Sequence, residues 1–94
     1  MLSQLPINLT KVSPANINQE ILRLGMIAEL DAVSLYEQLS AETQDQTIKK
    51  LLLDIAKEEK THIGEFQAML LQFDPEQVKE LEAGRKEVEE LGEK

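Results

Sequence analysis

The sequence predicts an all-α protein: an antiparallel hairpin of two long helices plus a short C-terminal helix, which pairs with a second copy as a four-helix bundle. Two stretches, residues 17–41 and 47–73, contain no proline and repeat their apolar residues at helical spacing. The polar segment between them, ETQDQ at residues 42–46, is long enough only for a turn, so the two helices lie antiparallel. Two helices alone cannot cover their apolar faces, and a second hairpin would cover them.

The chain begins with a segment whose composition differs from that of the helical region. Residues 1–16 carry two prolines among polar residues and predict an N-terminal arm. The helical domain then occupies residues 17–94, and the side chain of Asn16 or Asn18 can cap its first helix.

A third helix is predicted after the second. The segment DPEQ, residues 74–77, is a strong start signal, with Asp at the cap position, Pro at the first helical position and Gln at the third. We expect this helix to run to about Leu91 with an interruption at Gly84. It contains few apolar residues, so a docked tail and a partly frayed helix both fit the sequence.

Composition limits the classes of function. The 94 residues make one small domain, and 18 acidic against 10 basic residues give a net charge of −8. An anionic surface repels phosphate backbones, so we expect no nucleic-acid partner, but it can concentrate cations. The absence of cysteine excludes disulfides and a rubredoxin-type iron site within these residues. No apolar run approaches the ~20 residues of a membrane span, and no signal peptide begins the sequence. We therefore expect a cytoplasmic protein with no membrane partner.

A regular apolar stripe runs along the second predicted helix, and two polar residues interrupt it at mid-helix. The spacing alternates between three and four residues over nearly four heptads, which is typical of a buried helix–helix seam. The members of the stripe are Ile48, Leu52, Ile55, Glu59, His62, Phe66, Met69 and Phe73. Glu59 and His62, the only histidine, therefore fall where apolar residues are expected.

The first predicted helix repeats this arrangement, with one carboxylate near the centre of its stripe. The members of this stripe are Leu22, Met26, Glu29, Val33, Tyr36 and Ser40. Burying an ionised carboxylate without a partner costs several kcal/mol, and neither stripe contains Lys or Arg. A bound cation would compensate for Glu29 and Glu59, and a neutral His62 is a suitable third ligand.

A purely structural interpretation is also open. Glu59 and His62 can pair with each other one turn apart, while the Glu29 carboxylate extends to solvent. For His62 considered alone, this ordinary arrangement is the commoner one. Three ligand-type side chains on facing seams favour the metal site.

The number of ligands indicates how such a site is completed. Ferritin-like di-iron sites take one Glu from each of two helices and a Glu-x-x-His pair from each of the other two. One chain supplies half of this set, Glu29 with Glu59 and His62, and a twofold dimer would supply the whole. Oxygen-rich ligation with one His per metal suits iron or manganese better than structural zinc. Manganese, zinc or calcium could substitute for iron at these ligands.

Two segments carry a resemblance to a known family. AELDAVSLYEQLS, residues 28–40, and LLLDIAKEEKTHIGEFQAMLLQFDPEQ, residues 51–77, resemble the encapsulated ferritins, which are short ferritin-like proteins that act inside encapsulin nanocompartments. The resemblance extends over residues 17–90 and includes the order and spacing of the Glu, Tyr, Glu and His residues on the two seams.

The resemblance implies roles for particular residues. Glu29, Glu59 and His62 would be ferroxidase ligands shared across a dimer interface. Tyr36 would lie beside the metals, although an ordinary seam aromatic explains it equally well. The family assembles five dimers into a decameric ring, oxidises Fe(II) with oxygen and passes the iron to the interior of the shell. We therefore expect a ferroxidase with an encapsulin shell partner, located inside a nanocompartment in the cytoplasm.

The sequence departs from the family pattern at two places. Members carry surface carboxylates just before and two residues after the first ligand, which attract incoming iron; these positions are Ala28 and Asp31 here. Asp31 is therefore a candidate for metal uptake, and a solvated surface residue is the simpler interpretation. Separately encoded members end in a shell-targeting peptide, whereas this sequence ends in EVEELGEK. It most resembles the archaeal members fused to the N-terminus of the shell protein, so a longer chain is expected.

Two other functions stay open. A rubrerythrin-like peroxidase would use the same bundle, but rubrerythrins bring rubredoxin-type cysteines and carry both sets of ligands on one chain. A non-catalytic helical assembly module would use the polar core residues to fix the helix register. Metal content and the response of assembly to a chelator separate these functions.

Overall fold

The computed structural model describes residues 8–93, which contain three α-helices and no strand. A 3₁₀ turn at Leu9–Lys11 precedes α1 (Ile17–Glu42), α2 (Gln46–Phe73) and α3 (Pro75–Gly92). The all-α hairpin with a short C-terminal helix is therefore confirmed, with helix bounds within one residue of those predicted. Of the predicted N-terminal arm, residues 1–7 lie outside the described part, and the 3₁₀ turn was not predicted.

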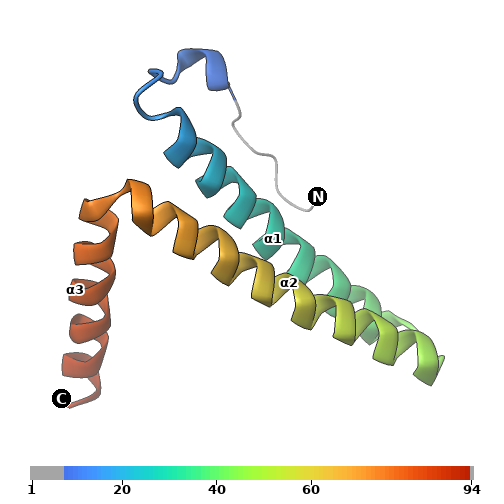
Figure 1. Ribbon diagram of the computed structural model, residues 1–94. Helices are drawn as coiled ribbons and strands as arrows, with labels where there is room; N and C mark the ends of the chain where they lie inside the picture. The colour runs from blue at the N-terminus through green and yellow to red at the C-terminus, as the bar shows by residue number, and fades with distance from the viewer. Residues whose placement is uncertain (1–7, 94) are drawn as a thin grey trace.

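The hairpin of α1 and α2 forms most of the structure. The two helices lie side by side along their length and run in opposite directions (Figure 1). The connection is short because Asp45 caps α2: its Oδ1 accepts a hydrogen bond from the Ile48 amide at 2.9 Å. At the other end of the hairpin Asn16 occupies the cap position of α1, but its side chain makes no capping hydrogen bond.

Helix α3 leaves the hairpin at a steep angle (Figure 1). Asp74 starts it, because its Oδ1 accepts a hydrogen bond from the Gln77 amide at 3.1 Å while its Oδ2 binds Arg23 Nη2 of α1 at 2.8 Å. The predicted interruption at Gly84 was wrong, since the helix continues through this residue. A single glycine costs a helix only about 1 kcal/mol. Farther along α3, Arg85 contacts both Glu82 and Glu89. The hydrogen bond that Arg85 donates to Glu82 lowers the pKa of Glu82.

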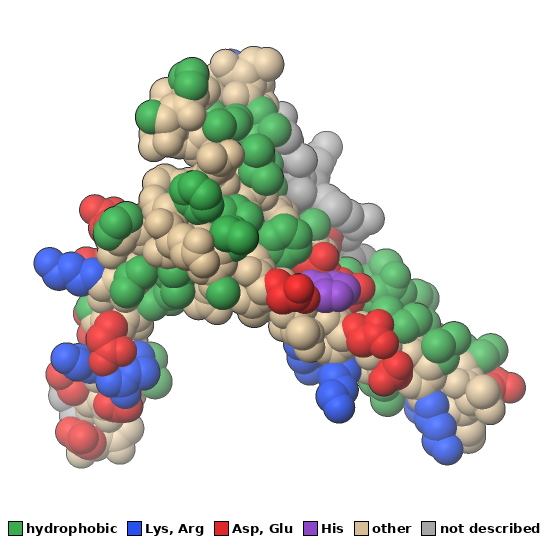
Figure 2. All heavy atoms as spheres, in the orientation of Figure 1, with side chains coloured by type: hydrophobic (Ala, Val, Ile, Leu, Met, Phe, Trp, Pro, Cys, Tyr) green, Lys and Arg blue, Asp and Glu red, His purple; other side chains and the backbone are tan. Residues whose placement is uncertain are grey.

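One chain buries very little of its apolar surface. Among residues 8–93 the only buried hydrophobic side chains are Ala56 and Leu70, and many large apolar side chains stay exposed on all three helices. The space-filling view shows them over much of the hairpin (Figure 2). The radius of gyration is 16.7 Å, against about 12 Å for a compact chain of this length. The fold thus leaves long apolar surfaces without a partner.

Within residues 8–93, no helix combines the length and the apolar character needed to cross a membrane.

Candidate metal centre

Three ligand-type side chains from the two hairpin helices meet at mid-length. His62 Nδ1 lies 3.2 Å from Glu59 Oε2, one turn earlier on α2, and 3.5 Å from Glu29 Oε2 on α1. One ligand atom from each residue lies within 4.8 Å of the others. In the space-filling view acidic side chains surround the single histidine (Figure 2). The structure therefore brings together the three metal ligands that the sequence predicted.

The Glu29 carboxylate is held in a way that fits a cation. Its Oε2 is buried and accepts no hydrogen bond from the described residues. The side chains of Glu29 and Glu59 are 21% and 18% exposed, and their only ion-pair partner among residues 8–93 is His62. A buried oxygen without a hydrogen bond costs roughly 1–3 kcal/mol, and more if the group is charged. A cation bound by Glu29, Glu59 and His62 would remove this cost.

The purely structural interpretation holds for the pairing of Glu59 with His62 but not for the position of Glu29. Glu59 and His62 do pair, and His62 donates a hydrogen bond to Glu59 in any state that carries a proton on Nδ1. The Glu29 carboxylate, however, does not extend to solvent, because its Oε2 points at His62. A metal bound through Nδ1 would displace that proton, since only the unprotonated nitrogen is a ligand.

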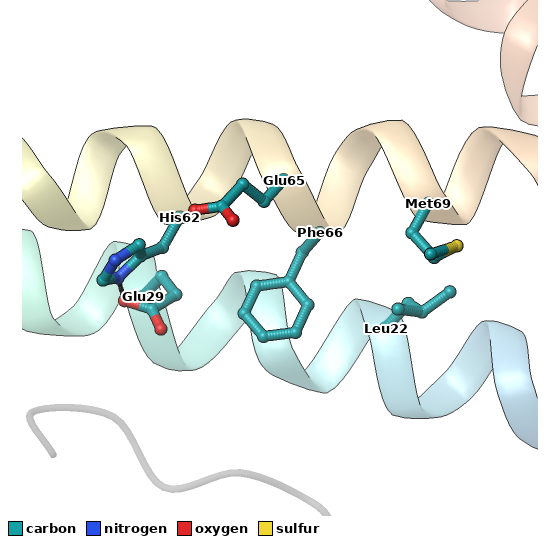
Figure 3. A pocket seen from close by; sticks show the side chains of 6 residues that line it. All are labelled: Leu22, Glu29, His62, Glu65, Phe66 and Met69. Atoms are coloured by element: carbon teal, nitrogen blue, oxygen red, sulfur yellow. Dashed lines mark ion pairs between the residues drawn. The ribbon is translucent and has the colours of Figure 1, made fainter.

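An open pocket of about 370 Å³ lies beside these ligands (Figure 3). Its lining residues come from both helices: Leu22, Glu29, His62, Glu65, Phe66 and Met69. Leu22, Phe66 and Met69 are members of the two apolar seams, so the pocket is a groove along the seam face. Glu65 was not predicted. Its position one turn after His62 was the signal, because residues three apart are neighbours on a helix.

A close helix approach fixes one wall of the pocket. The Phe66 ring lies against Gly25 of α1, where an added Cβ would come within 2.6 Å of the ring. Glycine is thus favoured at position 25 because it has no side chain, which leaves room for an aromatic ring between the helices.

The remaining predicted residues lie outside this group. Tyr36 is half-buried on α1, two turns after Glu29, and lines no part of the pocket. Glu58 is exposed, as expected. The interpretation of Asp31 as a solvated residue was wrong, because this residue is only 8% exposed. At 3.6 residues per turn Asp31 is rotated about 160° from Glu29. Its role in metal uptake stays a prediction, which its burial disfavours.

Comparison with known proteins places this geometry in a family. The model of the rubrerythrin family matches residues 20–93. The chain belongs to the rubrerythrin family. The chain is also similar to the encapsulated ferritin domain of Pyrococcus furiosus, whose crystal structure has a TM-score of 0.82 and 53% identity over 97% of this chain and 95% of that chain. The predicted resemblance to encapsulated ferritins and the ferritin-like fold are therefore confirmed.

A longer relative shows where such domains occur. A ferritin-like-encapsulin shell fusion protein of Pyrococcus furiosus is 60% identical over 72 residues, which are 77% of this chain and 21% of that protein. The chain thus spans about a fifth of the length of this relative, and the predicted similarity to shell-fused members is confirmed.

Proposed function

We propose that this protein is the ferroxidase of an encapsulin nanocompartment, which oxidises Fe(II) to Fe(III) with oxygen at a di-iron site formed between two copies of the chain. The observation that carries the proposal is the convergence of Glu29, Glu59 and His62, with a buried Glu29 oxygen that lacks a hydrogen bond from residues 8–93. Two carboxylates and one imidazole are half of the donor set of a ferritin-like di-iron site. The purpose would be iron storage or detoxification.

The second half of the site is proposed to come from a second copy. The ligands open onto a groove whose walls are the apolar side chains of Leu22, Phe66 and Met69. In a twofold dimer the same surface is used by both partners, so this groove would face itself. Such pairing would bury the apolar seams, complete a four-helix bundle and bring four carboxylates and two imidazoles together.

The chemistry is set by these donors. Glu29, Glu59 and His62 of each copy would hold two Fe(II) ions as substrate. Each ion gives one electron to oxygen, so two ions and two protons convert dioxygen to hydrogen peroxide, and four ions and four protons convert it to water. Hard carboxylate oxygens bind Fe(III) better than Fe(II), which favours the oxidation. We place Tyr36 beside the metals, where its ring would help to cover them.

A second apolar surface supports assembly beyond the dimer. Away from the seam groove, a pocket of about 330 Å³ lies where α1, α2 and α3 meet, and Ile27, Leu30 and Leu81 are exposed around it. A chain that uses one surface for a twofold dimer and another for a heterologous contact can close into a ring. We propose that five dimers form the decameric ring expected of the family.

The proposed partner outside the ring is an encapsulin shell. The shell fusion of the Pyrococcus furiosus relative supports this partner and a location inside a nanocompartment in the cytoplasm. Iron oxidised at the dimer interface would then be deposited in the interior of the shell.

The match to the rubrerythrin family favours one rival, a peroxidase on the same bundle. It would need electrons from a donor, and these 94 residues contain no cysteine for a rubredoxin-type centre. A hydrogen peroxide turnover assay with an electron donor separates the two reactions. A non-catalytic assembly module would bind no metal and keep its assembly state in EDTA.

The proposed activity is tested by Fe(II) oxidation with a matched pair of variants. Glu59→Ala removes one ligand, whereas Glu58→Ala removes the neighbouring exposed carboxylate from the same helix. We expect Glu59→Ala to oxidise iron no faster than buffer alone and Glu58→Ala to match the parent. Equal rates for Glu59→Ala and the parent would refute the assignment.

A further inference from the structure

Glu65 is the one residue of the seam groove with ligand chemistry and no role so far. It lies on α2 one turn after His62, and it lines the same pocket as Glu29 and His62. Its carboxylate points back along α2 toward the turn of His62 (Figure 3). Long helical side chains lean toward the N-terminus of their helix, so this direction is expected to persist in solution.

Two properties set Glu65 apart from the two candidate carboxylate ligands, Glu29 and Glu59. Its side chain is exposed, whereas Glu29 and Glu59 are largely buried. No hydrogen bond or ion pair holds it to any part of the chain between residues 8 and 93. At 3.6 residues per turn it is rotated about 60° from His62, away from the centre of the seam. In one chain it is thus placed at the rim of the groove rather than at the centre of the face that would pair with a second copy.

We propose that Glu65 is a transfer ligand: it binds Fe(II) at the mouth of the pocket and passes it to His62 and the buried carboxylate of Glu29. This inference rests on the proposed ferroxidase function and adds a route into its site. The end point of the route is Glu29, which lines the same pocket and whose Oε2 is buried without a hydrogen bond from the described residues.

The physical reason for such a ligand lies in dehydration. An Fe(II) ion reaches the site only after it exchanges its waters for protein oxygens and nitrogen. A flexible carboxylate at the rim can replace the first waters while the ion is still partly solvated, and an anionic groove raises the local concentration of cations. Glu65 itself has no competing partner in residues 8–93, so no contact within this part of the chain is broken when it binds the ion.

The two positions near Glu29 that were considered for metal uptake on the basis of the sequence do not offer this route. Ala28 has no ligand atom, and Asp31 is buried and lines no part of the pocket. Glu65 is the exposed carboxylate that shares a pocket with Glu29 and His62.

The test measures how fast the site fills, without oxygen or turnover. Co(II) is the probe, because it resists oxidation and its visible absorption reports binding by nitrogen and oxygen ligands. The dimeric protein is mixed rapidly with Co(II), and both the rate of filling and the final Co(II) per chain are recorded. Glu65→Gln removes the ligand charge, Glu65→Asp keeps a carboxylate on a shorter arm, and Glu58→Gln removes an equal charge outside the pocket.

We expect Glu65→Gln to fill about tenfold more slowly than the parent, with the same final Co(II) per chain. Glu65→Asp should recover part of the rate, and Glu58→Gln should match the parent. If Glu65→Gln fills as fast as Glu58→Gln, Glu65 transfers nothing. If it lowers the final Co(II) per chain, Glu65 is a permanent ligand and the transfer role is wrong.

These outcomes are distinct from failure of the ferroxidase itself. Parent protein that binds no Co(II) would overturn the proposed function together with the transfer role. The transfer role alone would be overturned if the parent protein binds Co(II) and the parent and Glu65→Gln oxidise Fe(II) at equal rates from low to saturating iron.

Discussion

His62 Nδ1 lies 3.5 Å from Glu29 Oε2, and this contact joins the middle of α2 to the middle of α1. Glu59 lies one turn before His62 on the same helix, so both carboxylates meet at one nitrogen. A hairpin that slipped by one residue would rotate Glu29 or His62 away from the other, so the candidate metal site depends on the register of the two helices.

The first prediction concerns the response of thermal stability to metal. A hundredfold excess of Mn(II) over its Kd stabilises the folded state by about 2.7 kcal/mol, which corresponds to a Tm increase of roughly 10–20 °C for a domain of this size. Calorimetry at a fixed protein concentration measures the shift. Glu29→Gln, which keeps the shape of the side chain, should lose the response.

The metal-free state provides the control for this experiment. Without metal, Glu29→Gln should be at least as stable as the parent, because the parent buries a carboxylate oxygen without a hydrogen bond from residues 8–93. A variant that is much less stable without metal, yet shows the same metal shift as the parent, would contradict the ligand role of Glu29.

The second prediction concerns the seam. Met69 and Leu53 are 47% and 46% exposed in one chain, but only Met69 belongs to the seam. Met69→Glu should prevent pairing of hairpins through the groove and abolish Fe(II) oxidation, because the dimer would bury a new charge. Leu53→Glu should keep both. Sizing chromatography measures the assembly state of each variant, and an iron oxidation assay measures its activity. If the two variants behave alike, the seam is not the dimer interface.

The third prediction concerns Gly25. Alanine there gains up to about 1 kcal/mol of helix propensity, but overpacking against the Phe66 ring costs about 1–3 kcal/mol. Gly25→Ala should therefore be less stable than the parent. Gly64→Ala, on α2 with nothing within 4 Å of the added Cβ, should be more stable. Urea denaturation of the metal-free chains compares them, and equal gains for both variants would show that the ring moves aside freely.

Much of the fold could be predicted because its signals are local. The caps at Asp45 and Asp74 lie next to the helices they start, and the heptad spacing marks which faces pack. The meeting of Glu29, Glu59 and His62 could be predicted because these three residues break that spacing on facing helices. The predicted interruption at Gly84 was wrong because a helix made of good helix formers tolerates one glycine.

The misses concern properties that spacing does not report. The burial of Asp31 depends on what covers the far side of α1, which no residue near it in the sequence indicates. The position of Glu65 beside Glu29 and His62 becomes visible only in the pocket that α1 and α2 form together, since along the chain it is one of many glutamates. The steep angle of α3 is tied to the Arg23–Asp74 ion pair, a contact between distant segments.

In the proposed ferroxidase each iron site is divided between two chains, and native mass spectrometry after anaerobic loading with Fe(II) tests this division. The spectrum reports how many ions each assembly carries. We expect two iron ions for every pair of chains, no iron on single chains, and no iron on any assembly of the Glu59→Ala variant. A single chain that retains its own iron, or a dimer that forms equally well and stays iron-free, would contradict it.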